Sequence, residues 1–306
     1  MNLSIIIPNY QGQNLLSKNL PKLVKELENY KEGNAEIIVV DDGSTDQSVK
    51  VVSNFSQVKL LKNDRNLGFS ITVNKGAKNA TGEILILLNN DVYPQSGFLK
   101  PLLDHFKSEK VFAVGCMDKS VEENTIVLRG RGEGTWKRGF LVHKRGEVDK
   151  SDTLWVSGGS GAFRKSLWDQ LGGLNELYTP FYWEDIDLSY RAQKAGYDVL
   201  FEKESVVFHE HEKGTIKRNF SPFKVKATAY RNQFIFAWTN LTDSKLMLEH
   251  FLWLPYHFIK AILNLDTAFN LGFFNALKML PKIIKSRNAN LKIFKLSDQQ
   301  VVRKYQ

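Results

Sequence analysis

The chain has 306 residues, with 42 Lys and Arg against 33 Asp and Glu, a formal net charge of +9 and one cysteine, Cys116. This length can bury a large core, either in one α/β domain or in a domain with an extension. A single cysteine excludes a disulfide framework and a cysteine-rich zinc site. We see no secretory leader ahead of the apolar run at residues 3–7, so we expect a reducing, cytoplasmic compartment.

The positive charge is concentrated near the C-terminus. Residues 1–211 hold 26 Lys and Arg against 28 Asp and Glu, whereas residues 212–306 hold 16 against 5. An almost neutral body therefore carries a strongly basic C-terminal segment. Such an excess favours nucleic acid or an anionic membrane surface as a partner.

Apolar runs alternate with helical patterns along the body. We expect strands at residues 3–7, 36–40, 58–61, 84–88 and 111–116, and helices at residues 15–27, 46–55, 68–80 and 96–107. Runs without polar alternation are typical of strands buried on both faces of a parallel sheet. Residues 118–153 are rich in charge and glycine and predict a loop or an irregular hairpin. A helix over residues 184–195 and strands near 198–201 and 206–208 follow.

Acidic and amide side chains follow two of the expected strands. Asp41 and Asp42 come directly after the second strand, and Asn89-Asn90-Asp91 follows the fourth. Open α/β sheets bind ligands at the carboxyl ends of their strands, so Asp41 or Asp42 can accept hydrogen bonds from a base or ribose. Asp91 alone is sufficient for a divalent cation whose other ligands come from a diphosphate and water. Ordinary capping turns are the structural alternative at both places.

A third acidic cluster begins the helix expected at residues 184–195. Glu184, Asp185 and Asp187 directly follow three aromatic residues, which sets negative charge beside an apolar wall. Such a setting raises a carboxyl pKa and suits a general base. The structural alternative is a helix start that favours acidic residues, with Asp187 and Arg191 as an i,i+4 pair.

His209 and His211 end the last expected strand. Alternate residues of a strand share a face, so both imidazoles can project together. Next to a metal-bound diphosphate an imidazole nitrogen is a suitable additional ligand, while solvent exposure is the alternative.

Together these segments resemble glycosyltransferase family 2, which has the GT-A nucleotide-sugar fold, over residues 3–215. The motifs that carry the resemblance are Ile7-Pro8-Asn9-Tyr10, residues 39–46, Asn66-Leu67-Gly68-Phe69, Asn74-Lys75-Gly76, Asn89-Asn90-Asp91, residues 172–176 and residues 183–188. Their order looks most like the branch with rhamnosyltransferases and galactofuranosyltransferases. The resemblance implies an α/β fold with a Rossmann-like, mostly parallel central sheet flanked by helices. It divides the chain into a catalytic domain at residues 1–215 and an amphipathic helical extension at residues 216–306.

The resemblance also implies a set of site residues. The nucleotide-sugar pocket would be formed by Pro8, Tyr10, Asp41, Asp42, Asn66, Gly68, Asn74, Asn89 and Asn90. Asp91 matches the family's metal aspartate, and His209, with His211 as the substitute, matches its metal-binding histidine. The first acidic position of that metal motif is Asn89 here, which departs from the usual pattern. Asp185 would be the catalytic base, and Tyr182, Trp183, Glu184 and Gly159 are candidates for the acceptor side, with core packing as the alternative for Trp183.

The implied reaction is an inverting sugar transfer assisted by Mg²⁺ or Mn²⁺. The donor would be a nucleoside-diphosphate sugar, UDP- or dTDP-linked, and the acceptor a hydroxyl of a glycan or lipid-linked saccharide in cell-surface polysaccharide synthesis. Asp185 would remove the acceptor proton as the hydroxyl attacks. The alternative is a catalytically silent module that binds a nucleotide sugar or a glycan.

The basic C-terminal segment mixes its lysines with large aromatic residues. Its apolar stretches are interrupted by Pro255, His257, Lys260 and Asp266, so none reaches the roughly 18 to 20 residues needed to cross a bilayer. Amphipathic helices of this composition are typical of the headgroup layer, which predicts a peripheral location at the inner face of the cell membrane. Helices packed on the catalytic domain, or an oligomer contact, are the alternatives. We expect no nucleic-acid partner, because no nucleic-acid motif accompanies the lysines.

Overall fold

The computed structural model describes residues 1–122, 125–209 and 220–305. Within them, a nine-stranded sheet has the order β3-β2-β1-β4-β10-β6-β11-β5, with β7 paired to β6. The strands are β1 (Leu3–Asn9), β2 (Ala35–Asp41), β3 (Val58–Lys62), β4 (Ile84–Leu88), β5 (Val92–Pro94), β6 (Val111–Glu122), β7 (Thr125–Arg129), β10 (Ser160–Arg164) and β11 (Asp198–His209). A separate hairpin is formed by β8 (Gly132–Lys137) and β9 (Phe140–Arg145).

The central strands are buried on both faces, as their apolar runs predict. β1 pairs in parallel with β2 and β4, and β2 pairs in parallel with β3. Ile5 and Ile7 belong to the hydrophobic cluster on one face of the sheet, and Ile6 belongs to the cluster on the other face. β10 runs antiparallel to both of its neighbours, while β6 and β11 are parallel. The carboxyl ends of β1, β2 and β4 therefore meet at one edge of the sheet.

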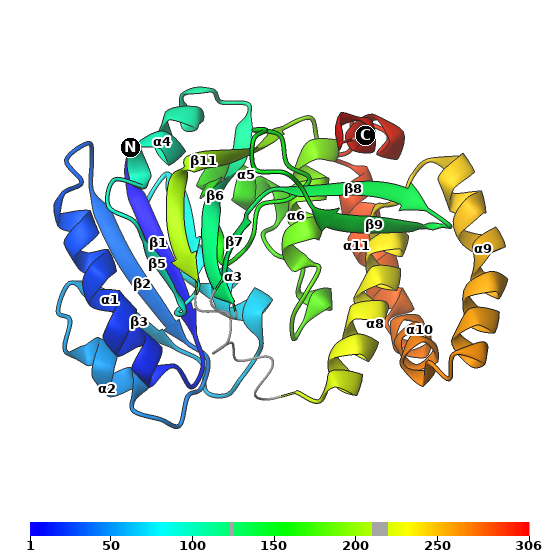
Figure 1. The fold of residues 1–306 in the computed structure, drawn as a ribbon, viewed down its shortest axis with the longest axis horizontal. Coiled ribbons are helices and arrows are strands. Elements are labelled where there is room, and N and C mark those ends of the chain that lie inside the picture. Colours follow the sequence, from blue (N-terminus) through cyan, green and yellow to red (C-terminus); the bar gives the residue numbers. More distant parts are fainter. Residues whose placement is uncertain (123–124, 210–219, 306) are drawn as a thin grey trace.

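Helices cover both faces of this sheet (Figure 1). The first face packs against α1 (Gln13–Glu28), α2 (Ser48–Ser53) and α4 (Leu99–Asp104), and the second against α3 (Phe69–Lys78), α5 (Lys165–Leu171) and α6 (Glu184–Lys194). Short 3₁₀ turns follow at His105–Lys107 and Glu176–Tyr178. The α/β architecture expected from the sequence is confirmed.

Residues 118–153 are more regular than the sequence indicates. Where we expected a loop or an irregular hairpin, the chain extends β6, returns as β7 and then forms the β8–β9 hairpin. β7 has only five residues and exposes the apolar side chains of Ile126 and Leu128, while β9 exposes the polar His143, Lys144 and Arg145, so neither strand has the buried apolar run of the central strands. The two strands expected near residues 198–208 are one strand, β11, with a register irregularity between Glu202 and Val206.

The C-terminal segment is helical and shares a core with the body. Its helices are α8 (Pro222–Asn240), α9 (Ser244–Leu263), α10 (Thr267–Lys278), α11 (Leu280–Leu291) and α12 (Asp298–Val302), followed by a 3₁₀ turn at Arg303–Tyr305. One hydrophobic cluster joins Phe234 and Phe236 of α8 with Phe140 of β9 and Tyr190 of α6. Figure 1 shows the β8–β9 hairpin extending from the sheet towards α9. The boundary predicted at residue 215 lies outside the described residues.

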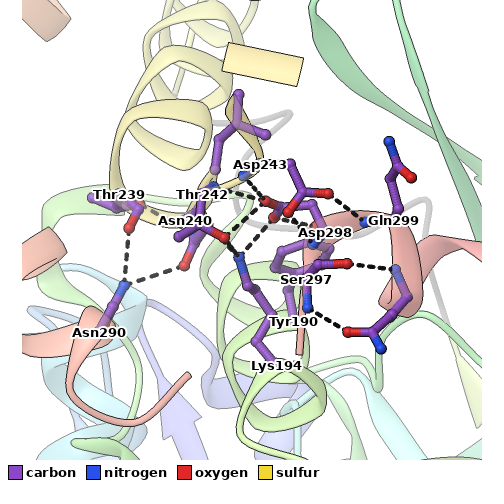
Figure 2. A network of polar contacts seen from close by, with 12 residues as sticks. Tyr190, Lys194, Thr239, Asn240, Thr242, Asp243, Asn290, Ser297, Asp298 and Gln299 are labelled. Atoms are coloured by element: carbon purple, nitrogen blue, oxygen red, sulfur yellow. Dashed lines mark hydrogen bonds and ion pairs between the residues drawn. The ribbon is translucent and has the colours of Figure 1, made fainter. Parts of the chain in front are cut away.

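A buried ion pair fixes α12 to α6. The Lys194 ammonium lies 2.8 Å from Asp298 Oδ1, and both side chains are fully buried. Asp298 also accepts hydrogen bonds from the Tyr190 hydroxyl and from the backbone N–H groups of Thr242 and Asp243. Figure 2 shows these contacts meeting between α6, the start of α12 and the turn between α8 and α9. Because an unpaired buried charge is costly, this network ties the last helices to the helix that begins with Glu184 and Asp185.

None of the described helices has the length and apolar character that a bilayer-spanning helix requires.

Candidate active site

Three strand ends are linked by buried amides at the carboxyl edge of the sheet. Asn9, at the end of β1, donates from Nδ2 to Asp41 Oδ1 at 2.9 Å, and its Oδ1 accepts from Asn90 Nδ2 at 2.8 Å. The other oxygen of Asp41 accepts from the N–H of Ser44 at 2.9 Å. Asn9 was not among the predicted site residues, although it stands in the motif after Pro8. The chain of bonds sets Asp41 and Asn90 at fixed positions along one edge.

Asp42 organises the loop that precedes α3. Its Oδ1 accepts from Asn63 Nδ2 at 2.8 Å and from the N–H of Leu67 at 2.9 Å, and its Oδ2 accepts from the N–H of Gly68 at 2.9 Å. Gly68 has φ +91°, and a Cβ there would lie 2.7 Å from Thr179 Cγ2, so only glycine fits. Asp42 therefore fixes the conformation of this loop. The Asn66 side chain in the same loop is exposed near the carboxyl edge of the sheet.

A glycine turn joins the predicted base to the Asn89–Asp91 segment. The N–H of Gly158 lies 3.4 Å from Asp185 Oδ2, and the carbonyl of Gly159 accepts from the N–H of Asn89 at 3.0 Å. A Cβ on Gly159 would lie 2.5 Å from Asn89 Nδ2, so the turn can approach this closely only without a side chain. The turn therefore brings the start of α6 against the end of β4.

The two carboxyl groups at the start of α6 are electrostatically unusual. Burial raises the pKa of Asp185 above its ordinary value, although the N–H groups of Ile186 and Gly158 oppose that rise. Burial, followed by the charge of Asp185, raises the pKa of Glu184 to about 8. Glu184 Oε2 is buried and makes no hydrogen bond within the described part of the chain. A carboxylate with a raised pKa is a stronger base than an exposed aspartate.

His209 lies between two aspartates. Its Nε2 is 3.2 Å from Asp91 Oδ1, and its Nδ1 is 2.8 Å from Asp118 Oδ2. Burial by itself would lower the pKa of His209, but the hydrogen bond to Asp118 and the charge of Asp91 raise it to about 9. Asp118 is not among the residues predicted from the sequence, because it stands in the middle of β6 and meets β11 only through the pairing of those strands.

Asp91 and His209 fit a divalent cation. Asp91 Oδ1 is buried without a well-formed hydrogen bond to any described residue, and the 3.2 Å contact with His209 is a charge contact. A carboxylate oxygen and an imidazole that is oriented by a second carboxylate are suitable ligands. Among the described residues, no three Asp, Glu, His or Cys side chains form a complete metal site. A cation here would therefore need further ligands from a bound diphosphate and water.

A strained loop presents the start of α6. Tyr182 and Trp183 have φ of +70° and +77°, in the left-handed region that residues other than glycine rarely adopt. The fully buried Asn232 of α8 donates from Nδ2 to the carbonyls of Tyr178, Phe181 and Tyr182 at 3.1, 2.9 and 2.8 Å. Its neighbour Arg231 donates to the carbonyl of Thr179 at 2.5 Å. These bonds hold the backbone that directly precedes Glu184 and Asp185.

The remaining predicted site residues have different surroundings. Pro8 and Tyr10 are partly exposed at the end of β1. Asn74 exchanges two hydrogen bonds with the backbone of Leu174, so its amide braces α3 against the turn after α5. Tyr182 is 42% exposed, as an acceptor contact requires.

Trp183 is buried and packs against His143 and Phe236, which matches its core alternative. His211 lies outside the described residues.

Comparison with known proteins decides the family. Residues 4–172 match the family model described as glycosyl transferase family 2. The chain belongs to this family. An O-antigen chain rhamnosyltransferase of Salmonella typhimurium is 25% identical over 217 residues, which cover 69% of this chain and 67% of the relative. A dolichol-phosphate mannosyltransferase of Pyrococcus furiosus is 29% identical over 38% of this chain and 33% of its own length. The resemblance read from the motifs is confirmed.

Solved structures of glycosyltransferases share the fold. GalNAc-T7, solved with UDP, GalNAc and Mn²⁺, superposes with a TM-score of 0.65 at 19% identity, over 80% of this chain and 48% of that chain. S. aureus TarS with UDP-GlcNAc gives 0.60 at 16% identity, over 100% and 91%. A mannosyltransferase of Pyrobaculum calidifontis, solved with GDP-Man and Mn²⁺, gives 0.55 at 15% identity, over 94% and 85%. The fold is therefore GT-A.

Proposed function

We propose that this protein is an inverting glycosyltransferase that moves a sugar from a nucleoside diphosphate to a hydroxyl of a glycan or lipid-linked saccharide. The observation that carries the proposal is the turn at Gly158 and Gly159, which contacts Asp185 on one side and Asn89 on the other. A proton acceptor and the segment that ends in Asp91 thus flank one turn. A direct displacement needs these two functions close together, one at the attacking hydroxyl and one at the departing phosphate.

The donor would be held along the carboxyl edge of the sheet. Asp41, Asn66 and Gly68 border the side proposed for the base and ribose, and Asn89 to Asp91 border the side proposed for the diphosphate. The solved neighbours were crystallised with UDP, UDP-GlcNAc or GDP-Man. A UDP- or dTDP-linked sugar is the donor that we propose. Asn9 and Asp42 would keep this edge rigid through their buried bonds.

Asp91 and His209 would hold Mg²⁺ or Mn²⁺ together with the donor. The metal, when bound, would offset negative charge on the departing nucleoside diphosphate. Asp118 would orient His209 by accepting a hydrogen bond from Nδ1, which leaves Nε2 facing Asp91.

Asp185 would act as the general base. Its carboxylate removes the proton of the acceptor hydroxyl as the hydroxyl oxygen forms a bond to the anomeric carbon and the bond to the diphosphate oxygen breaks. The attack comes from the face opposite the leaving group, so the anomeric configuration inverts. Tyr182, exposed next to the base, is the side chain that we propose for packing against the acceptor.

We also propose that the acceptor belongs to cell-surface polysaccharide synthesis and that the protein works at the inner face of the cell membrane. The relative from Salmonella typhimurium is an O-antigen chain rhamnosyltransferase. The basic charge of residues 212–306 agrees with an anionic surface nearby.

Asp185→Asn tests the proposed base, since it keeps the size of the side chain and removes its proton-accepting charge. We expect donor affinity, measured by calorimetry with UDP-sugars and Mn²⁺, to stay within a few-fold. Transfer or slow donor hydrolysis should fall by about 10²- to 10⁴-fold. Asp169→Asn makes the same change at a side chain that is 54% exposed on α5 and serves as the control. Near-normal turnover by Asp185→Asn would remove Asp185 from the role. Donor binding without any turnover by the wild-type protein would favour the silent binding module.

A further inference from the structure

The outward side of α9 is apolar from Leu248 to the end of the helix at Leu263. Six large side chains are exposed by more than half: Leu248 (59%), Phe251 (55%), Leu252 (68%), Ile259 (58%), Ile262 (64%) and Leu263 (78%). Their spacing of three and four residues sets them on one side of the helix, which we call the α9 face. The opposite side carries Leu246, His250 and Ala261, which are buried against the rest of the chain. A helix that only packs on a domain presents polar residues to water on its outer side, and α9 does not.

The α9 face lies on a long helix at the edge of the molecule (Figure 1). Its helix has 20 residues and is therefore about 30 Å long, and Figure 1 shows it at the edge of the molecule farthest from the sheet. From His250 to Ile259 the sequence contains no Asp, Glu, Lys or Arg. α10, which packs against α9, adds the exposed Leu271 and Phe274. Apolar exposure on this scale marks an interaction surface.

The helices that carry and follow this face are rich in basic residues. Residues 244–291 contain six Lys and Arg against two Asp and Glu, and Lys245, Lys260, Lys278, Lys282 and Lys285 are all exposed. One of the two acidic residues, Asp266, is paired with Lys226 at 2.8 Å. At the tip of the β8–β9 hairpin, Arg138 donates to the Tyr256 hydroxyl at 2.8 Å, and its guanidinium lies 5.5 Å from the centre of the Trp253 ring. Apolar side chains can insert among the acyl chains of a bilayer, while basic and amphipathic aromatic side chains near them can contact anionic headgroups.

We propose that the α9 face is a membrane-docking surface, which inserts into the boundary between the headgroups and acyl chains of an anionic bilayer. A second copy of the chain is the less suitable occupant, because it would bring two sets of lysines together. Docking would bring the active site to lipid-linked acceptors, and this purpose rests on the proposed function. The physical binding of vesicles does not depend on catalysis.

The test is sedimentation of the full chain with vesicles of phosphatidylglycerol and phosphatidylethanolamine, compared with neutral phosphatidylcholine vesicles. The variant Leu252→Glu with Ile259→Glu adds two charges at positions that are 68% and 58% exposed. The control, Ile126→Glu with Leu128→Glu, adds the same charges at exposed positions of β7. We expect the wild type and the control to sediment with anionic vesicles and the α9 variant to bind at least tenfold more weakly. Lys260→Gln should weaken binding by roughly fivefold, the effect of one basic residue near an anionic surface.

The outcomes separate docking from catalysis. Circular dichroism and donor hydrolysis in the absence of vesicles should be the same for all variants, because the substituted side chains are exposed and none belongs to the proposed site. Equal vesicle binding by the α9 variant and the control, or equal binding of the wild type to neutral and anionic vesicles, would overturn the proposal. So would a wild-type dimer that the α9 substitutions convert to a monomer without any vesicle binding. Vesicle binding by a protein that turns over no sugar donor would uphold the docking surface and reject the proposed function.

Discussion

Asn232→Ala is the substitution that most directly tests how the start of α6 is held. The Asn232 amide has two hydrogens and faces three carbonyls, so it makes about two full hydrogen bonds in a fully buried place. Two neutral bonds contribute about 1–3 kcal/mol in net terms. The left-handed conformations of Tyr182 and Trp183 cost about 1–2 kcal/mol each. The two quantities are of similar size, so the bonds of Asn232 offset much of the cost of the strained shape.

We therefore expect Asn232→Ala to lower the free energy of unfolding by about 2–4 kcal/mol, and to reduce kcat for donor hydrolysis more than tenfold with little change in donor Kd. Tyr182→Gly removes the cost of one left-handed residue and should restore part of the lost kcat in the double variant. Hydrolysis is the suitable assay, because water as the acceptor avoids any contact with the Tyr182 ring. Asn290→Ala is the matched control, since Asn290 is a buried amide of α11 that bonds to Thr239 and Asn240.

The control should lose stability and keep its kcat. The reasoning would be refuted by an Asn232→Ala protein that is destabilised but turns over donor at the wild-type rate. An additive effect of Tyr182→Gly and Asn232→Ala on kcat would refute the part of the argument that concerns backbone strain.

Three further predictions concern the surrounding groups. Asp118→Asn should weaken Mn²⁺ binding to the protein–UDP complex by about 10- to 100-fold in calorimetric titration, because His209 loses its orienting carboxylate, and unchanged affinity would contradict this. Glu184 has a folded pKa of about 8 against an ordinary value of 4.5, so its contribution to stability is complete below pH 4.5 and is lost as the pH rises through 8. Glu184→Gln should remove that loss in urea unfolding at pH 5, 7 and 9, and an unchanged pH dependence would assign the loss to another group. Asp298→Asn should cost about 3–5 kcal/mol in the same assay because it leaves Lys194 buried without its counter-charge, whereas Asp169→Asn in an exposed pair should cost less than about 1 kcal/mol.

The sequence predicts the parts of the fold that depend on local pattern. β1, β2 and β4 contain the unbroken apolar runs Ile5–Ile7, Ile37–Val40 and Ile84–Leu88, so their burial on both faces could be predicted directly. The polar groups after β2 and β4 could be predicted to lie together because parallel strands end at one edge, and their role in ligand binding stays a prediction. Residues 118–153 could not be predicted in the same way, because β7 and most of β9 are exposed, so neither strand has a buried apolar run that marks it in the sequence. Arg138, with φ +51°, and Gly139 form a hairpin tip that looks like part of a loop in the sequence.

The residues that could not be predicted from the sequence contact groups that are far away along the chain. Asp118 meets His209 across 91 residues because β6 and β11 are neighbours, and no local pattern reports that register. Asn232 acts on the backbone of residues 178–182, about 50 residues earlier in the chain. Asn74 was assigned to the nucleotide pocket by its motif, while its side chain is bonded to the backbone of Leu174. A sequence motif indicates which residue type stands at a position, but it does not indicate whether the side chain contacts a ligand or another part of the chain.

The C-terminal helices carry the α9 face and also contact α6, the helix at whose start the proposed base lies. α6 begins with Glu184 and Asp185, and along its length Asp187 accepts from Asn240 of α8 at 2.7 Å while Lys194 pairs with Asp298 of α12. A truncation after about residue 245 would therefore remove the α9 face and, at the same time, leave Lys194 buried without a counter-charge. If the truncated protein failed to bind membranes, the cause could be either the missing α9 face or unfolding of α6, the helix that carries the proposed base. Point substitutions at Leu252 and Ile259 leave these buried bonds intact, so they can separate docking at a membrane from the integrity of the catalytic helix.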